Sequence, residues 1–304
     1  MKSFPASLAI AALSILLALP AVAADKMTVV LDWFVNPDHA ALVVAREHGF
    51  FARHGLDVEL IAPADPNIPL TTVAAGKADL AVSYEPVTDM QIDAGLPLQR
   101  VGTLIDQPLN TLIVLQDGPV KSLADLKGRK IGFSVGGFED ALVGAMLEKA
   151  GLNMKDVTMV NVNFNLVTAL MSGQVDAVVG GYRNFEMNEL ALDKRPGHAF
   201  FVEQNGVPRY AELILVQQRN GAFARTDRLP RFLAALREAT AWLKEHPDEA
   251  WNLFAKSGKE LDTPLNRLAW RDTVPLLADD PARIVAAQST AFYAFLKARG
   301  LVKR

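Results

Sequence analysis

Short apolar runs rich in Val, Leu and Ile alternate along the first third of the chain with segments whose apolar residues recur at helical spacing. The runs predict strands, and the segments predict the helices between them. The elements expected here are the strand 27–31, the helix 39–47, the strand 56–60, the helix 70–75 and the strand 80–82. Strands separated by helices in this order favour an α/β fold with a doubly wound sheet.

A second unit with the same order begins near Ser122, which is suited to cap a short helix over 123–127. The elements expected next are 130–134, 139–150, 158–162, 166–171 and 177–179, which are strand, helix, strand, helix and strand. The segments 76–82 and 173–179 are alike, because each has a glycine that ends a helix, an aspartate three positions later and then an apolar strand. This likeness predicts two similar lobes.

Two further apolar runs, 112–116 and 213–217, resemble each other. If both pass between the lobes as a two-strand hinge, the second lobe is inserted into the first. Residues 24–116 and 217–304 then form lobe 1, and residues 117–216 form lobe 2. The alternative is that the two runs are unrelated core strands. The last third of the chain is helical in pattern, and its helices are expected to pack on lobe 1.

The amino terminus has the pattern of a secretory signal peptide. Lys2 supplies a positive charge, residues 8–19 are almost all apolar, and Ala21-Val22-Ala23 forms an A-x-A cleavage pattern. The alternative is a membrane anchor, but the apolar run is shorter than the roughly 20 residues that span a bilayer and it ends at Pro20. We therefore expect residues 1–23 to be removed and the rest to be periplasmic.

Composition excludes several classes of function. Of the 304 residues, 31 are Lys or Arg and 34 are Asp or Glu, with no block of like charges, so a nucleic-acid partner is not expected. The chain contains no cysteine, which excludes disulfides, thiolate metal sites and a cysteine nucleophile. The common catalytic and phosphate-binding motifs are missing, and the five histidines lack metal-ligand spacing. No metal and no cofactor are expected.

Polar and aromatic residues gather in the loops that follow the expected strands. Ligands of open α/β sheets bind at the carboxyl ends of strands, so these loops predict a small-molecule site between the lobes. The candidate ligand-binding residues are Trp33, Asn36, Asp38, His39, Tyr84, Glu85, Phe138, Tyr182 and Glu186.

The residue types in these loops favour a flat, uncharged or weakly basic ligand. Rings from both lobes, Trp33 and Tyr84 against Tyr182, would hold a planar heterocycle face-on. The Glu186 carboxylate would accept hydrogen bonds from an amino group and a ring N–H. The loop 136–140 carries acids in the first turn of its helix, which disfavours an anionic ligand. The alternatives are that Trp33 only caps the core and that Glu186 is solvated.

Two segments carry a family resemblance. Residues 122–132, SLADLKGRKIG, are similar to the S-L-x-D-L-K-G-K-x-I-G segment of type II periplasmic solute-binding proteins. Residues 31–40, LDWFVNPDHA, resemble the L-D-W-x-P-N-x-x-H segment of the family that includes formylaminopyrimidine-binding proteins and the pyrimidine synthases of thiamine biosynthesis. Val35 stands where that family usually has proline.

The resemblance implies a two-lobed periplasmic binding protein of type II with the ligand in the cleft. It implies that Trp33, Tyr84 and Glu186 contact the ligand and that an ABC transporter permease in the inner membrane is the partner. The expected protein is a monomer that binds a thiamine-related aminopyrimidine of the formylaminopyrimidine kind. Riboflavin or another flat nitrogen heterocycle is the alternative cargo, and a sensor is an alternative partner.

The synthase branch of the same family is the alternative of another class. The resemblance implies a Cys-rich, iron-associated segment in that branch, and this chain has no cysteine. Export would also separate the protein from a cytosolic biosynthetic pathway. We therefore expect a binding protein and not an enzyme.

Overall fold

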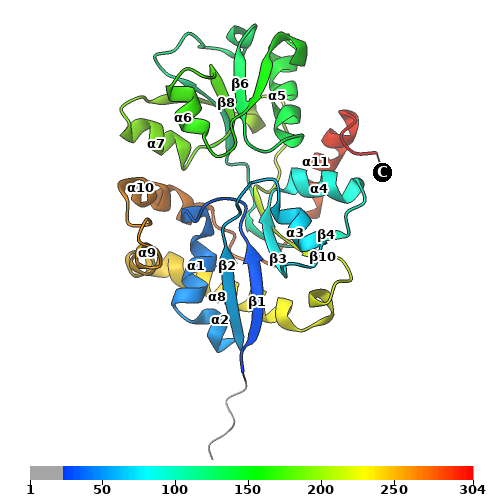
Figure 1. Ribbon diagram of the computed structural model, residues 1–304, viewed down its shortest axis with the longest axis vertical. Helices are drawn as coiled ribbons and strands as arrows, with labels where there is room; N and C mark the ends of the chain where they lie inside the picture. Colours follow the sequence, from blue (N-terminus) through cyan, green and yellow to red (C-terminus); the bar gives the residue numbers. More distant parts are fainter. Residues whose placement is uncertain (1–22, 304) are drawn as a thin grey trace, which may run out of the picture.

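The computed structural model describes residues 23–303, which form two lobes stacked one above the other (Figure 1). The predicted signal peptide lies outside the described residues, apart from Ala23. Each lobe is built around one five-stranded sheet with helices on its faces. The predicted α/β class is confirmed, and so is the strand–helix–strand–helix–strand order predicted over 27–82 and over 130–179. The helices at 85–93 and 186–192 and the strands at 98–105 and 197–201 were not predicted. Residues 23–303 contain no helix with the length and apolar character that a bilayer crossing requires.

The sheet of lobe 1 has the strand order β2-β1-β3-β10-β4. The first three strands are parallel, and β10 runs antiparallel to both of its neighbours. The strands are β1 (Asp25–Val30), β2 (Leu56–Ile61), β3 (Leu80–Ser83), β4 (Leu98–Ile105) and β10 (Leu213–Gln218). The helices are α1 (Ala40–Glu47), α2 (Phe50–Arg53), α3 (Pro69–Ala74), α4 (Glu85–Asp93), α8 (Arg228–Glu245), α9 (Pro247–Lys256), α10 (Pro264–Thr273) and α11 (Ala286–Ala298).

The sheet of lobe 2 repeats this arrangement with the order β7-β6-β8-β5-β9. Here β6 is parallel to β7 and β8, and β5 is antiparallel to β8 and β9. The strands are β5 (Asn110–Leu115), β6 (Lys130–Phe133), β7 (Thr158–Asn161), β8 (Ala177–Tyr182) and β9 (Gly197–Phe201), and the helices are α5 (Phe138–Lys149), α6 (Leu166–Met171) and α7 (Glu186–Leu192). Six 3-10 turns complete the described elements: η1 (Pro37–His39), η2 (Leu123–Leu126), η3 (Met154–Asp156), η4 (Val202–Gln204), η5 (Phe223–Arg225) and η6 (Val274–Leu276).

The likeness of the runs 112–116 and 213–217 has a structural cause. Their strands, β5 and β10, occupy the same place in the two sheets, as the antiparallel fourth strand. Each is also the first strand that the chain forms after it crosses from the other lobe. The expected boundaries at 116/117 and 216/217 are therefore corrected: the chain crosses at 106–109, between β4 and β5, and at 205–212, between η4 and β10.

Local sequence fixes the helix ends that surround the site. Gly76 and Gly173, predicted to end helices, have positive φ angles of 70° and 74°, which glycine adopts without strain. Asn36 begins the η1 turn, where its side chain accepts a hydrogen bond from the backbone N–H of Asp38, and Pro37 is the first residue of the turn. This capped turn gives the loop after β1 a fixed conformation.

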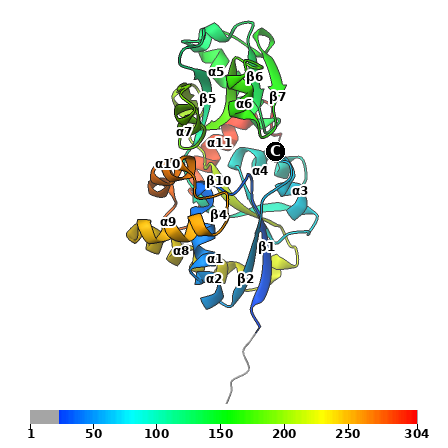
Figure 2. The same ribbon diagram turned by 60° about the vertical axis from the view of Figure 1, so that its left-hand side comes forward.

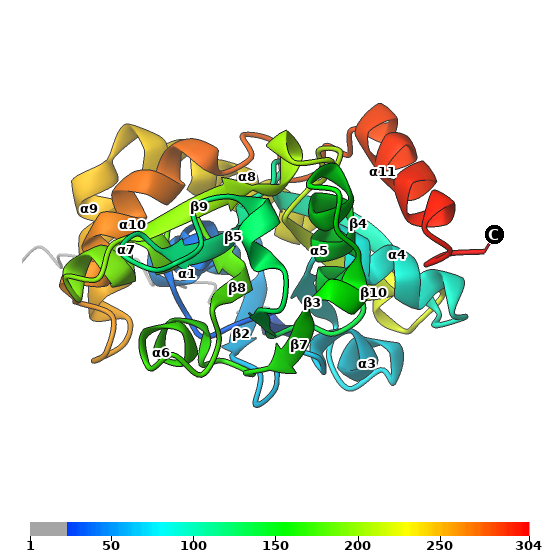
Figure 3. The ribbon, with the colours of Figure 1, turned by 90° about the horizontal axis from the view of Figure 1, so that it is seen from above.

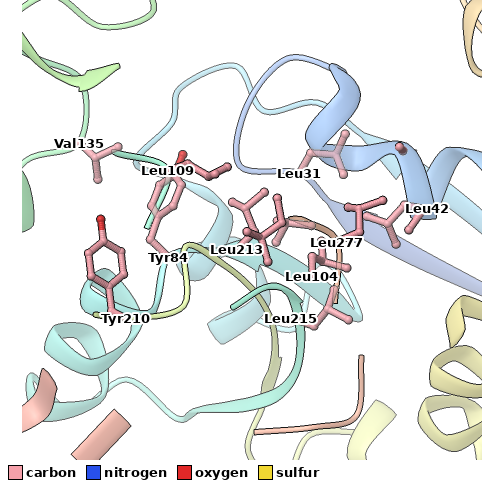
Figure 4. Close-up of a cluster of buried hydrophobic side chains, with 14 of the residues drawn as sticks. Leu31, Leu42, Tyr84, Leu104, Leu109, Val135, Tyr210, Leu213, Leu215 and Leu277 are labelled. Atoms are coloured by element: carbon pink, nitrogen blue, oxygen red, sulfur yellow. The ribbon is translucent and has the colours of Figure 1, made fainter. Parts of the chain in front are cut away.

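The apolar core continues from one lobe into the other at the hinge. Figure 4 shows Leu213 of lobe 1 beside Tyr84, with Leu31 farther along the same cluster and Val135 of lobe 2 above the two tyrosines Tyr84 and Tyr210. All of these residues are buried. Since dense packing of this kind resists shear, the core at the hinge restricts how the lobes can move.

Helices of the two lobes also meet on either side of the hinge. In the view from above, α7 of lobe 2 lies by α10 on one side, and α5 lies by α4 on the other (Figure 3). The carboxyl-terminal helix α11 packs against α4 at the junction (Figure 2). Arg299, just after α11, forms an ion pair with Glu148 of α5 at 2.7 Å. The described structure is thus a closed arrangement in which the lobes touch.

Candidate ligand-binding cleft

A cavity lies between the lobes, at the carboxyl ends of their parallel strands. Asp32 and Trp33 follow β1, Tyr84 follows β3 and Ser134 follows β6. This is the edge at which open α/β sheets bind ligands. The space among the lining side chains amounts to about 440 Å³, part of it open to solvent. The lining residues are Asp32, Trp33, Asn36, Asp38, Tyr84, Asn110, Ser134, Val135, Phe138, Glu139, Gly180, Tyr182, Phe185, Glu186 and Glu212.

Most of the residues predicted from the sequence share this cavity. The predicted residues that line it are Trp33, Asn36, Asp38, Tyr84, Phe138, Tyr182 and Glu186. They come from both lobes, so the structure brings the four predicted loops together. Their contact with a ligand stays a prediction.

His39 does not line the cavity, and its contact with a ligand stays a prediction. Its side chain is fully buried behind the loop, where Nδ1 accepts a hydrogen bond from the Asn36 backbone N–H at 3.3 Å. Nε2 therefore carries the proton and donates to Asp32 Oδ1 at 2.9 Å. The other oxygen of Asp32 accepts a hydrogen bond from the Tyr84 hydroxyl at 2.9 Å. His39 thus fixes Asp32, and Asp32 fixes Tyr84, at the cavity wall.

Glu85 is the second predicted residue that lies outside the cavity wall. It is the first residue of α4, and this turn directs its buried side chain to the hinge. Arg100 donates to Glu85 Oε1 at 2.7 Å, and the Ala211 backbone N–H donates to Oε2 at 2.6 Å. Ser289 of α11 also donates to Oε1. The carboxyl group of Glu85 therefore holds the second crossover segment in place.

Aromatic rings from both lobes form the apolar part of the wall. Tyr84 of lobe 1 and Phe138 of lobe 2 lie nearly parallel, with ring centroids 6.0 Å apart and an angle of 25°. Trp33 meets Phe164 of lobe 2 edge to face at 4.5 Å. Trp33 and Tyr182 line the same cavity, as the hypothesis of a planar ligand held between rings of both lobes requires. Trp33 therefore lies at the interface of the two lobes and not in the core of lobe 1 alone.

The polar part of the wall is strongly acidic. Five carboxyl groups line the cavity, and no Lys or Arg of the described chain lines it. The five residues are Asp32, Asp38, Glu139, Glu186 and Glu212. A buried anion needs a compensating charge or hydrogen-bond donors, so this wall disfavours an anionic ligand and favours one that brings N–H groups.

Two of these carboxyl groups are bound mainly by backbone N–H groups of lobe 2. Glu139 Oε2 accepts hydrogen bonds from the backbone N–H groups of Ser134 at 2.8 Å and Val135 at 3.1 Å. Glu186 Oε2 accepts one from the Tyr182 backbone at 2.6 Å. Burial disfavours the charged form and raises the pKa of Glu139 and of Glu186 to about 8. Both are therefore largely protonated near neutral pH. The alternative that Glu186 is solvated is wrong, because only 7% of its surface is exposed.

The other two acids with shifted titration lie at the lobe junction. Asp38 Oδ1 accepts hydrogen bonds from Asn184 at 2.6 Å and from Thr273 at 3.1 Å, and burial raises its pKa to about 6. Glu212 precedes β10 in the second crossover, and burial raises its pKa to about 7. The two carboxyl groups therefore titrate close to physiological pH.

Three buried polar atoms on this wall have no hydrogen-bond partner among residues 23–303. They are Asp38 Oδ2, the Tyr182 hydroxyl and Glu212 Oε1. Buried polar atoms in folded proteins are nearly always paired with protein or with water, so these three atoms are open to partners from a bound molecule or from water. Burial holds the pKa of Tyr182 well above its ordinary value, so its hydroxyl is a donor. The two carboxyl oxygens can accept.

Sequence reasoning missed several lining residues. The strand-end rule that selected Tyr84 also applied to Asp32, two residues after β1, and to Ser134, which directly follows β6. Glu139 was noted only for its effect on the helix dipole. Asn110 is the first residue of β5 and Glu212 precedes β10, so neither follows a strand and that rule gave no signal for either. The arrangement offers no metal site, since no group of three or more His, Asp or Glu residues in the described chain is placed to hold a metal ion.

The two lobes and the cavity between them have the arrangement of a periplasmic-binding-protein fold, and the cleft is lined by acidic and aromatic residues. The chain belongs to the NMT1/THI5 like family, whose sequence profile matches residues 36–250. A Haemophilus influenzae protein assigned by name to thiamine biosynthesis is 51% identical over 96% of this chain and 93% of its own. The formylaminopyrimidine-binding protein of Halalkalibacterium halodurans is 33% identical over 84% of this chain and 78% of its own.

Among proteins with lower sequence identity, some relatives are named as enzymes, and some solved structures of similar fold are binding proteins. The 4-amino-5-hydroxymethyl-2-methylpyrimidine phosphate synthase of Uromyces fabae is 28% identical over 84% of this chain and 78% of its own. Among solved structures, the alkanesulfonate-binding protein of Xanthomonas axonopodis pv. citri superposes with a TM-score of 0.73 at 19% identity, over 93% of this chain and 96% of its own. At that identity the similarity shows the shared fold alone.

Proposed function

We propose that this protein is the periplasmic solute-binding component of an ABC importer and that it captures a thiamine-related aminopyrimidine of the formylaminopyrimidine kind. The observation that carries the proposal is the cleft itself. It joins rings of both lobes to five carboxyl groups, with no cationic side chain on the described wall. The Halalkalibacterium relative, which is named for binding formylaminopyrimidine, supports the same ligand class.

The proposed pose places the pyrimidine ring among Trp33, Tyr84 and Tyr182. Ring pairs of this kind contribute roughly 0.5–1.5 kcal/mol each beyond the burial of area. Glu186 faces the edge of the ring. A protonated carboxyl has both a donor O–H and an acceptor oxygen, so it complements a ring nitrogen flanked by an amino group. Asn36 and Asp38 then pair with the substituent.

Export and transport complete the proposal. The signal pattern of residues 1–23 would direct the chain to the periplasm, where a monomer with two lobes could close on its ligand. A ligand that contacts both lobes favours the closed form, because it binds that form better than the open one. The permease in the inner membrane would then receive the closed, loaded protein.

The second candidate function is pyrimidine synthesis, which the names of relatives such as the Uromyces fabae synthase favour. The resemblance associates that branch with a Cys-rich, iron-associated segment. This chain has no cysteine in any of its 304 residues. The binding role is therefore preferred. Formation of a pyrimidine product on incubation of the purified protein with iron would favour the synthase instead.

Calorimetric titration of the purified protein with formylaminopyrimidine and with riboflavin tests the proposal. We expect formylaminopyrimidine to bind and riboflavin to give no heat. Glu186→Ala should weaken binding roughly 30-fold, the effect of about 2 kcal/mol, since it removes both hydrogen bonds to the ring edge. Glu189→Ala, on the same helix and outside the cavity wall, is the matched control and should bind normally. Binding of riboflavin alone, or equal affinities of the two variants, would contradict the proposal.

A further inference from the structure

Only two segments of the described chain connect the lobes, residues 106–109 and residues 205–212. A hinge motion in a two-lobed protein is absorbed by backbone rotations in such segments. Any hydrogen bond between the two segments therefore depends on the angle between the lobes. A side chain that makes such a bond and also faces the ligand would connect the ligand to the hinge.

Glu212 has both properties. Its Oε2 accepts hydrogen bonds from the backbone N–H of Leu109 at 2.7 Å, from that of Asn110 at 2.9 Å and from the Tyr210 hydroxyl at 3.1 Å. One carboxyl oxygen of the second crossover thus holds two amides at the end of the first. Glu212 has no exposed surface, it lines the cavity, and its Oε1 has no partner among residues 23–303.

Glu85 shows by contrast what is special about Glu212. Glu85 also binds a crossover amide, that of Ala211, but both of its oxygens have partners and Arg100 lies at 2.7 Å. It does not line the cavity. Glu85 can therefore stabilise the hinge but cannot respond to a ligand.

The groups around Glu212 do not fix its protonation state, so a ligand can change it. The titratable and charged groups that face it are Glu139 of α5, Tyr84 before α4, Tyr182 of β8, Tyr210 of its own segment and Arg183 after β8. Arg183 is the one cation in this set, and it is bound to Glu203 at 2.8 Å. Burial raises the pKa of Glu212 to about 7, so the group is partly protonated near neutral pH. Because Oε2 already accepts three hydrogen bonds, the proton resides on Oε1.

We propose that Glu212 couples ligand binding to lobe closure. An N–H donor of the ligand binds Oε1, and the proton of that oxygen leaves to solvent. The ionised carboxylate then holds the Leu109 and Asn110 amides more strongly. Hydrogen bonds to an ionised acceptor are about twice as strong as those to a neutral one, so the closed arrangement that contains them gains stability. The formylamino N–H or the ring amino group supplies the donor. This inference rests on the proposed aminopyrimidine ligand and adds Glu212 to its site as a positioning residue for the hinge.

The test compares Glu212→Gln with Glu139→Gln, titrated with formylaminopyrimidine. Glu139 is the matched control, because it is buried and lines the same cavity, but its carboxyl group binds only backbone amides of lobe 2. Closure is followed by energy transfer between dyes on cysteines introduced at the exposed residues Asp57 of lobe 1 and Lys155 of lobe 2, in a chain that has no other cysteine. Protons released on binding are measured from the dependence of the binding heat on the buffer.

We expect wild-type protein near pH 7 to release roughly half a proton from this group on binding and to close fully. Glu139→Gln should keep full closure at saturating ligand even where its affinity falls. Glu212→Gln should bind at least about tenfold more weakly, close only in part at saturation and lose that proton release. Should Glu212→Gln fail to fold, Tyr210→Phe serves instead. It removes one donor to Oε2, which favours the protonated carboxyl and moves the pH midpoint of proton release upward.

The outcomes separate the two hypotheses. Full closure and unchanged proton release in Glu212→Gln, with normal binding by the wild type, would overturn the role of Glu212 alone, as would an unmoved midpoint in Tyr210→Phe. Failure of the wild type to bind formylaminopyrimidine at all would overturn the proposed function and this coupling with it.

Discussion

Asn184 of lobe 2 and Asp38 of lobe 1 lie with Nδ2 and Oδ1 2.6 Å apart in the closed cleft, and both side chains are buried. Asn184 also donates to the Thr273 hydroxyl at 2.7 Å, and Thr273 in turn donates to Asp38. One interlobe cluster therefore joins three side chains that are far apart in the sequence. Asn184 follows β8, Thr273 ends α10 and Asp38 lies in η1. This cluster exists only while the lobes touch, although Asn184 itself does not line the cavity.

Removal of the Asn184 side chain should weaken ligand binding without touching the ligand. Asn184→Ala deletes a buried bond to a carboxylate that is present only in the closed form, which costs about 1–2 kcal/mol, or roughly 5- to 30-fold in affinity. Calorimetry on formylaminopyrimidine measures the change. Asn188→Ala is the control, since it deletes half-buried bonds to Asp272 and to the Asn184 carbonyl, each at 2.9 Å, but leaves the Asn184 side chain in place, and it should cost less than roughly threefold. Equal losses in the two variants would show that the buried cluster has no special role.

A side chain at Gly180 should disturb the site through Glu139. Gly180 has a φ of 93°, and a Cβ added there would lie 2.3 Å from Glu139 Oε1. Gly180→Ala should therefore displace the carboxyl group and lower ligand affinity at least about tenfold, in addition to a backbone cost of about 1 kcal/mol. Gly173→Ala has the same kind of backbone strain, with a φ of 74°, but nothing lies within 4 Å of its added Cβ.

Thermal unfolding and calorimetry separate these two effects. Both alanine variants should lose a similar amount of stability from the backbone, and only Gly180→Ala should also lose affinity. Normal ligand binding by Gly180→Ala would mean that the Glu139 carboxyl is not needed in its present position.

The buried glutamates predict that the protein in its closed arrangement becomes less stable as pH rises. The pKa of Glu139 and of Glu186 is about 8 in the folded chain, against an ordinary value of 4.5. Between these values the folded state binds more protons than the unfolded state, so the free energy of unfolding decreases as pH rises through this window. We expect the melting temperature to fall by roughly 10–20 °C between about pH 5.5 and pH 8.5, since two groups that titrate over this range together remove about 6 kcal/mol.

The control for this pH dependence is a pair of single variants. Glu139→Gln removes one of the titrating groups and should flatten the decline. Glu59→Gln, on an exposed position of β2, should leave it unchanged. A melting temperature that rises steadily over the same pH range would refute the assignment of protonated acids to the cleft.

Local pattern was sufficient for the elements that repeat over 27–82 and 130–179 and for the symmetry of the lobes, but α4, β4, α7 and β9 were not predicted. The alternation of β-rich runs and helical segments follows from burial on a strand or helix face, which each segment shows by itself. The likeness of 112–116 and 213–217 was also visible in the sequence. The expected boundaries placed the first run in lobe 1 and most of the second in lobe 2, whereas their strands belong to the sheets of lobe 2 and lobe 1. Strand pairing joins β10 to β3 and β5 to β8, which are distant in the sequence, so no local signal could assign either strand to its sheet.

For the site, the strand-end rule selected the correct loops but not the direction of every side chain. Tyr84 and Glu85 are neighbours after β3, yet Tyr84 lines the cavity and Glu85 turns to the hinge because α4 begins at that residue. The side chain of His39 lies behind Asp32, away from the cavity, for a similar reason, because the η1 turn buries it. A one-residue step on a turn or helix rotates a side chain by about 100°.

The sequence by itself determined the order of strands and helices, the two related lobes and the loops that carry the aromatic residues, because periodic burial and turn preferences are properties of short segments. Only the tertiary structure decided which carboxyl groups share one cavity. Asp38, Glu186 and Glu212 are brought together from two lobes and a crossover, and the burial that raises the pKa of each exists only once the lobes have packed. Desolvation depends on every atom around a group, and most of those atoms come from distant parts of the chain.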